Sequence, residues 1–116
     1  MANEILADPL LVWVADGGDA ALVFVELGRE ADWLKASEKL PPTRWREAGR
    51  AVASGEFVAA AEAYAAIGAR FMEAWARLLA AERGDLAQLE LARAFFTAAG
   101  AKPFLARCDA VLAASA

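Results

Sequence analysis

The sequence predicts an all-α fold, and three observations support this prediction. Of its 116 residues, 32 are Ala and 14 are Leu, and both residue types favour helices. The β-branched residues that favour strands are few, with seven Val, two Ile and two Thr. Gly and Pro recur at intervals that divide the chain into segments of helix length. We therefore expect one domain over residues 1–116, with seven or eight helices and no strand.

The first 39 residues are predicted to form a helical hairpin and a connecting helix. The Asp-Pro pair at 8–9 is typical of a helix start, and the Gly-Gly pair at 17–18 is typical of a helix end. Asp19 is placed to cap a second helix, which Gly28 ends. A third segment stops before the Pro-Pro pair at 41–42. The expected helices are 10–16, 20–27 and 30–39.

Residues 40–116 show a more regular pattern. Thr43 is placed to cap a helix that Gly55 ends, and Asp85 is placed to cap a helix that runs from 86 to 99. Three further glycines, at 68, 84 and 100, mark the other helix ends. Apolar residues recur at steps of three and four, which predicts amphipathic helices. The candidate core residues are Phe57, Tyr64, Ile67, Trp75, Leu78, Leu89, Phe96 and Leu112.

A short frame of Gly, an acidic residue and an apolar helix occurs three times. It begins at Gly18, Gly55 and Gly84, so the spacings are 37 and 29 residues. This spacing is typical of a helix–turn–helix repeat. Short amphipathic helices are unstable alone, and stacking hairpins side by side buries both faces of the inner ones.

The segment Gly55–Tyr64 resembles the junction of a tetratricopeptide (TPR) repeat, which has Gly-Asp-Tyr followed by a small Ala and a Tyr. The segment from Gly84 is similar to it, with Leu89 at the position of the small Ala. The wider run over 40–116 resembles the TPR-like C-terminal regions of large bacterial regulators with AAA-type ATPase modules, of the adenylate-cyclase-like and LuxR types. This resemblance implies antiparallel hairpins stacked as a right-handed repeat and a binding role. It brings no active-site residues to this chain.

Composition excludes several kinds of chemistry. The chain has no His and one Cys, so an imidazole base, an internal disulfide and a multi-Cys zinc site are excluded. We expect no cofactor and no metal. The net charge of −4 argues against nucleic acid as a partner. The apolar runs at 9–15 and 20–25 are too short to cross a membrane, and no secretory signal is recognised, so a cytoplasmic location is expected.

Few side chains suggest reactive or paired groups. Cys108 shares a helical face with Phe104 and Leu112, which favours a buried structural thiol. Two pairs, Glu73–Arg77 and Glu90–Arg93, have the spacing of ion pairs on a helix surface.

The candidate binding residues are Trp45, Arg46 and Arg50. Arg46 and Arg50 lie four residues apart, on one face of a predicted helix. They suggest a groove for an acidic peptide, with Trp45 as an aromatic wall. The alternatives are an exposed face, a partner for the acidic N-terminal third, and core packing for the tryptophan.

The first hairpin is the least polar part of the chain, which predicts self-association through it. Repeat stacks need polar ends, yet only Asp16, Asp19 and Glu26 carry charge between 9 and 27. The residues expected at a homodimer interface are Val12, Trp13, Val23 and Phe24.

The expected function is a non-catalytic helical scaffold that binds a protein or peptide partner. One alternative is a self-associating structural domain, which would form a homodimer through the N-terminal hairpin. The other alternative is a small-molecule-binding helical domain or an enzyme. Convergent polar groups, which a small-molecule site needs, are scarce in this composition.

Overall fold

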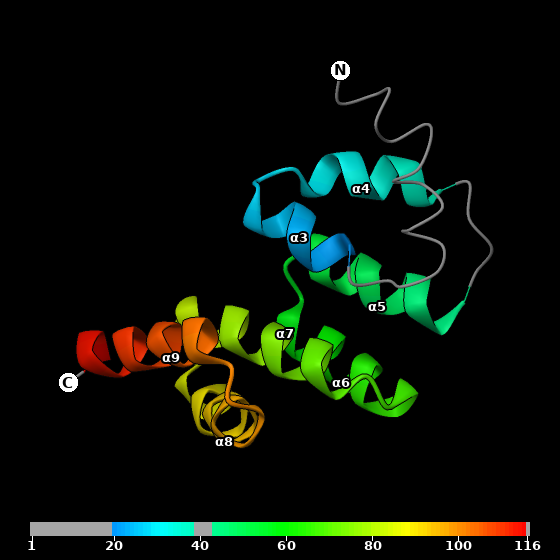
Figure 1. The fold of residues 1–116 in the computed structure, drawn as a ribbon. Helices are drawn as coiled ribbons and strands as arrows, with labels where there is room; N and C mark the ends of the chain where they lie inside the picture. Colours follow the sequence, from blue (N-terminus) through cyan, green and yellow to red (C-terminus); the bar gives the residue numbers. More distant parts are fainter. Residues whose placement is uncertain (1–19, 39–42, 116) are drawn as a thin grey trace.

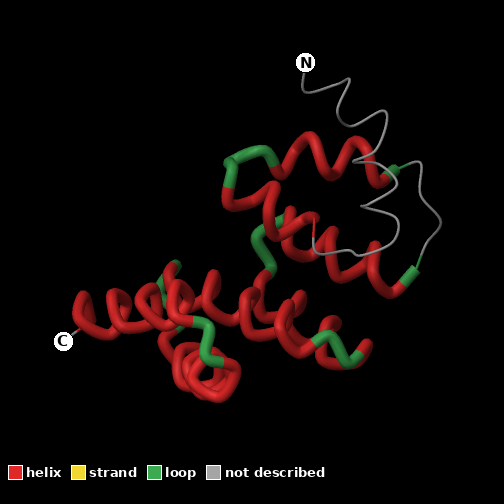
Figure 2. The backbone as a smooth tube through the Cα atoms, viewed as in Figure 1, coloured by secondary structure: helices red, strands yellow, loops and turns green. Residues whose placement is uncertain are grey.

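The computed structural model describes residues 20–38 and 43–115, and these residues form seven α-helices and no strand (Figures 1 and 2). A 3-10 helix, η1, precedes α8. The predictions for the first helix and for the breaks at 17–18 and 41–42 lie outside the described residues. The bounds are α3 Ala20–Glu26, α4 Glu30–Ser37, α5 Arg44–Ala53, α6 Phe57–Ile67, α7 Arg70–Glu82, η1 Leu86–Gln88, α8 Leu89–Ala99 and α9 Lys102–Ser115.

The glycine breaks predicted within the described residues are confirmed. Helices α6 and α8 end at Gly68 and Gly100, whose φ angles of 86° and 69° lie in the left-handed region. Only glycine adopts this conformation without steric cost, so these residues stop the helices where they stand. Gly28, Gly55 and Gly84 lie at the other predicted breaks and also have positive φ.

One predicted helix cap is confirmed and another is wrong. The hydroxyl of Thr43 accepts a hydrogen bond from the backbone N–H of Arg46 at 3.2 Å, at the start of α5. Asp85 instead precedes the three-residue 3-10 helix and makes no side-chain capping bond. The α-helix that was expected from residue 86 therefore begins at Leu89.

Two clusters of buried residues form the core, and α7 contributes to both. Ala76, Leu79 and Ala80 belong to the first cluster, with residues of α3 to α6. Leu78 belongs to the second cluster, with α8 and α9. Helix α7 is therefore packed on two sides. Consistent with this, it packs against α6, α8 and α9 and makes a smaller contact with α3.

Most of the predicted core residues are buried. Phe57, Tyr64, Leu78, Leu89 and Phe96 are at most 6% exposed, and Ile67 and Trp75 are half-buried. Leu112 is 51% exposed, so its prediction is wrong. It lies in the last turns of α9, where Leu112 to Ser115 are all exposed and no described helix covers this side.

Helices α4 and α5 cross at a close contact between Trp33 and Gly49. Trp33 is fully buried, and its indole ring lies where a side chain of residue 49 would be. A Cβ atom added to Gly49 would lie 2.5 Å from Cη2 of Trp33 and closer still to Cζ2. The missing side chain therefore lets the two helices approach around the indole.

Candidate protein-interaction surface

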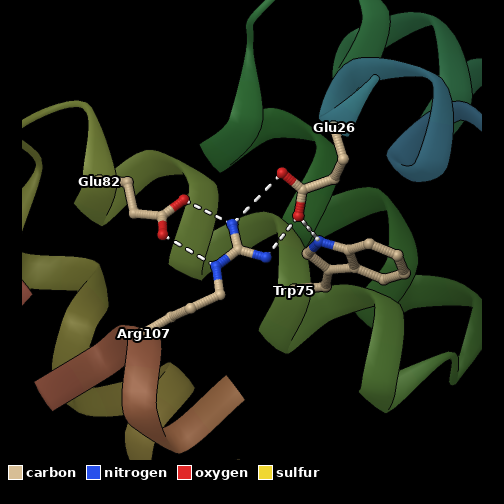
Figure 3. A network of polar contacts seen from close by, with 4 residues as sticks. All are labelled: Glu26, Trp75, Glu82 and Arg107. Atoms are coloured by element: carbon tan, nitrogen blue, oxygen red, sulfur yellow. Dashed lines mark hydrogen bonds and ion pairs between the residues drawn. The ribbon is translucent and has the colours of Figure 1, made fainter. Parts of the chain in front are cut away.

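Arg107 of α9 joins two carboxylates from distant parts of the chain (Figure 3). Its Nε and Nη2 donate to the two carboxylate oxygens of Glu82, on α7, at 2.9 and 2.7 Å. Its Nη1 donates to Oε2 of Glu26, at the end of α3, and Nη2 lies 3.3 Å from Oε1 of Glu26. The guanidinium is therefore held by two carboxylates, one from α7 and one from α3.

A second donor converges on Glu26. Trp75 lies on α7, and its indole Nε1 donates a hydrogen bond to Oε2 of Glu26 at 3.0 Å. The same carboxylate oxygen thus accepts from α7 and from α9 (Figure 3). We name the Trp75 indole N–H and the Arg107 guanidinium the carboxylate seat, because together they hold this oxygen.

The carboxylate seat is partly open to water. The Arg107 side chain is 32% exposed and those of Glu26 and Glu82 are each 30% exposed. The hydrogen bond to Glu82 raises the pKa of Arg107 above its usual value, and the bond to Glu26 adds to it, against a lowering by partial burial. Arg107 is therefore a permanent cation that an anion can reach.

Aromatic side chains from α7, α8 and α9 gather beside the carboxylate seat. The Phe71 ring makes edge contacts with Trp75, Phe95, Phe96 and Phe104, at centroid distances of 5.2 to 6.5 Å. Phe104 also contacts Trp75, at 5.3 Å. Phe71 is 36% exposed, so part of this apolar cluster reaches the surface.

A groove with a volume of about 450 Å³ begins at the Glu82–Arg107 pair. We call it the α7–α9 groove. Its walls come from the end of α7, from η1 and from α9, and most of the side chains are small or apolar. Leu86 is 46% exposed there. The residues lining the groove are Ala81, Glu82, Gly84, Leu86, Arg107, Ala110, Val111, Ala114 and Ser115.

The binding residues predicted on α5 lie elsewhere. Trp45 is half-buried and packs against Tyr64, with ring centroids 6.3 Å apart. Arg46 is half-buried, and it has interaction partners of its own. Arg50 is exposed. The structure thus places one of the two arginines at the surface and gives the tryptophan a packing role, and these three residues do not line the α7–α9 groove.

The residues predicted for self-association are divided. Val12 and Trp13 lie outside the described residues. Phe24 is 5% exposed and belongs to the first core cluster, and Val23 is half-buried. Phe24 therefore packs inside its own chain and offers no surface to a second copy.

The side chains with reactive or pairing potential have structural roles. Cys108 is fully buried in the second core cluster, and burial raises the pKa of its thiol. The predicted pair Glu73–Arg77 is confirmed at 2.9 Å. Arg93 pairs with Asp109 at 3.2 Å rather than with Glu90, because α9 brings a carboxylate to it.

Two further findings apply to the described part of the chain. Residues 20–38 and 43–115 hold no group of three or more metal-ligating side chains. They also hold no helix that is long and apolar enough to cross a membrane.

The carboxylate seat is a feature that sequence reasoning missed. Trp75 and Arg107 lie 49 and 81 positions along the chain from Glu26, the residue that occupies the seat. No periodicity or motif links such positions. The one available signal was an isolated Glu at the end of an otherwise apolar helix.

Comparisons with family models, with curated proteins and with solved structures find no match to this chain. The α7–α9 groove and the carboxylate seat are therefore the features of this chain that bear on its function.

Proposed function

We propose that this chain is a non-catalytic helical scaffold that binds a segment of another protein in the α7–α9 groove. In this proposal its helices are TPR-like hairpins in a right-handed stack, and it acts in the cytoplasm as part of a bacterial signalling system. The partner is a protein or peptide and not a nucleic acid. The glycine breaks after α6 and α8, and the packing of each helix on the next, support the repeat arrangement.

The observation that carries the proposal is the apolar character of the α7–α9 groove. Leu86 is 46% exposed on one wall of the groove. An exposed leucine in a concave surface is typical of sites that receive an apolar side chain from a partner. The small residues Gly84, Ala110 and Ala114 leave room for it.

The polar groups of the groove favour binding over chemistry. Its two charged side chains, Glu82 and Arg107, are already paired with each other. Its hydroxyl, that of Ser115, donates a hydrogen bond to the backbone carbonyl of Leu112 at 2.9 Å. A nucleophile or general base would need a partner that activates it, and these groups are used in structural contacts.

Site-specific photo-crosslinking of the full chain in cells tests this proposal. A benzoylphenylalanine replaces Leu86 in the groove or, as a control, the exposed Glu62 on α6. We expect a discrete adduct with another protein from position 86, and its loss when Ala114→Asp places a charge in the groove. Equal adducts from both positions, or an adduct that persists with Ala114→Asp, would contradict the proposal. An adduct of twice the mass of the chain would favour the homodimer instead.

A further inference from the structure

Arg107 is held in position without Glu26. The two bonds from Nε and Nη2 to Glu82 form a bidentate pair, which fixes the plane of the guanidinium. Glu82 belongs to α7, the helix that is packed on two sides. The Nη1 group therefore keeps its direction when Glu26 moves away.

Trp75 also keeps its direction, because its ring contacts Phe71 and Phe104 at 6.5 and 5.3 Å. Its indole N–H and Nη1 of Arg107 point at the same place, which Oε2 of Glu26 occupies. Two fixed donors that converge on one oxygen make a preorganised site for a carboxylate.

Glu26 can leave this site by rotation of its own side chain. The neighbouring residues Leu22 and Phe24 anchor α3 in the first core cluster, so the helix stays in place. The ion pair is about one-third exposed, and pairs of this kind are weak because water competes for both partners. A carboxylate from outside can therefore compete with Glu26.

The surroundings define what that carboxylate is attached to. Arg107 lines the apolar α7–α9 groove, and its Cζ lies 5.9 Å from the centre of the Phe104 ring, which belongs to the aromatic cluster. A ligand that pairs with Arg107 and also contacts these apolar surfaces has an acidic side chain next to apolar ones. A short acidic and apolar segment of a protein has this chemistry.

We propose that the carboxylate seat binds a Glu or Asp side chain of the partner segment, and that Glu26 occupies the seat in the free chain as an internal competitor. This inference rests on the proposed function, because it specifies which segments the groove accepts. The internal carboxylate lowers the affinity for segments that carry no acidic residue and for weak acidic ligands, so it sets a threshold for binding.

An NMR titration of the full chain tests the inference. The probe is the synthetic peptide acetyl-Phe-Val-Glu-Leu-amide, and the control is the same peptide with Gln in place of Glu. The readout is the indole N–H signal of Trp75, assigned by its loss in Trp75→Phe. The proteins are the wild type, Glu26→Gln, and Glu26→Gln combined with Arg107→Gln, each checked for helix content by circular dichroism.

We expect the Glu peptide to shift the Trp75 signal and to bind Glu26→Gln about tenfold more tightly than the wild type, as for a site that is free about a tenth of the time. The Gln peptide should leave the signal unchanged, and Arg107→Gln should abolish binding. Equal affinity for both peptides, equal affinity of the wild type and Glu26→Gln, or binding that survives Arg107→Gln would overturn the inference. If Glu26→Gln does not fold, the two peptides are compared on the wild type at higher concentration, where a lack of discrimination also overturns it.

This experiment separates the inference from the proposed function. A crosslink at position 86 that depends on the groove, combined with no discrimination between the peptides, rejects the carboxylate seat and keeps the scaffold. Peptide binding at Trp75 without a groove-dependent crosslink keeps the seat and rejects the groove as the docking site.

Discussion

At the scale of single residues, the contact between Trp33 and Gly49 leaves no room for a methyl group. Gly49→Ala would place Cβ 2.5 Å from Cη2 of a fully buried ring. We expect overpacking to destabilise the fold by about 1–3 kcal/mol, which exceeds the ~0.5–1 kcal/mol that Ala gains over Gly inside a helix. Urea unfolding followed by circular dichroism measures the difference.

Trp33→Phe provides the matched control for this prediction, since the smaller ring vacates the space that the new Cβ needs. It also removes Nε1 of Trp33, which is buried and makes no hydrogen bond within the described structure. The double variant should therefore be more stable than the sum of the two single changes predicts. Additive effects would show that the crossing of α4 and α5 relaxes around the methyl group.

The buried thiol of Cys108 predicts a dependence of stability on pH. Burial, and after it the charge of Asp109, raise the pKa of this thiol in the folded chain, against a smaller lowering by Arg93. The folded state thus holds the proton more tightly than the unfolded state. The stabilisation is complete below the ordinary thiol pKa of about 8.5 and is lost as the pH rises above it, by up to about 1.4 kcal/mol per pH unit.

Urea unfolding of the wild type and of Cys108→Ala at about pH 7.5 and about pH 9.5 checks this sign. The wild type should lose more stability between the two pH values than the variant, because other titrating groups are common to both. Identical losses would mean that the thiolate forms in the folded chain without penalty.

At the scale of elements, the start of α5 depends on one exposed hydroxyl. Thr43→Ala removes the acceptor of the bond from the Arg46 N–H, at 3.2 Å, and should destabilise the chain by about 1 kcal/mol. Thr43→Ser keeps an oxygen at this place and should lose only a small part of that value. Thermal unfolding compares the three proteins, and equal melting temperatures would show that water replaces the cap.

The helix boundaries show what was predictable from the sequence. Gly68 and Gly100 stop helices through the conformation of a single residue, so local chemistry is enough to place these ends. The expected start of a helix at Asp85 is wrong because the next three residues form a 3-10 turn before α8. The helix propensity of these residues does not distinguish a 3-10 turn from the first turn of an α-helix.

The candidate site was less predictable because it depends on how helices cross. Arg107 meets Glu26 and Glu82 only because α9 lies beside the ends of α3 and α7. Arg46 and Arg50 have the spacing of one helical face, yet Arg46 is half-buried and Arg50 is exposed. Spacing along a helix predicts which residues share a face, and neighbouring helices decide whether that face is open.

At the scale of the whole molecule, α7 connects the two core clusters. Leu78 packs into one cluster and Leu79 into the other. In contrast, the last turns of α9 are exposed. We expect backbone amides in the centre of α7 to exchange hydrogen at least about a hundredfold more slowly than those at the end of α9, after correction for intrinsic rates.

Hydrogen exchange followed by NMR measures these rates residue by residue. Uniform protection along α7 and the end of α9 would show that the chain opens only as one unit. Protection that is weaker in α7 than in α5 would contradict a central position for α7.

The contact between Glu26 and Arg107 also has a kinetic consequence. It closes a loop between residues that are 81 positions apart, whereas most packing in the chain joins helices that are neighbours in sequence. Closing so long a loop is entropically costly, so we expect this ion pair to form after the folding transition state. Glu26→Gln, which removes this long-range ion pair and keeps the pair between Arg107 and Glu82, should then accelerate unfolding in stopped-flow experiments and leave the refolding rate unchanged. In the native chain, the same ion pair would slow unfolding without changing the rate of folding.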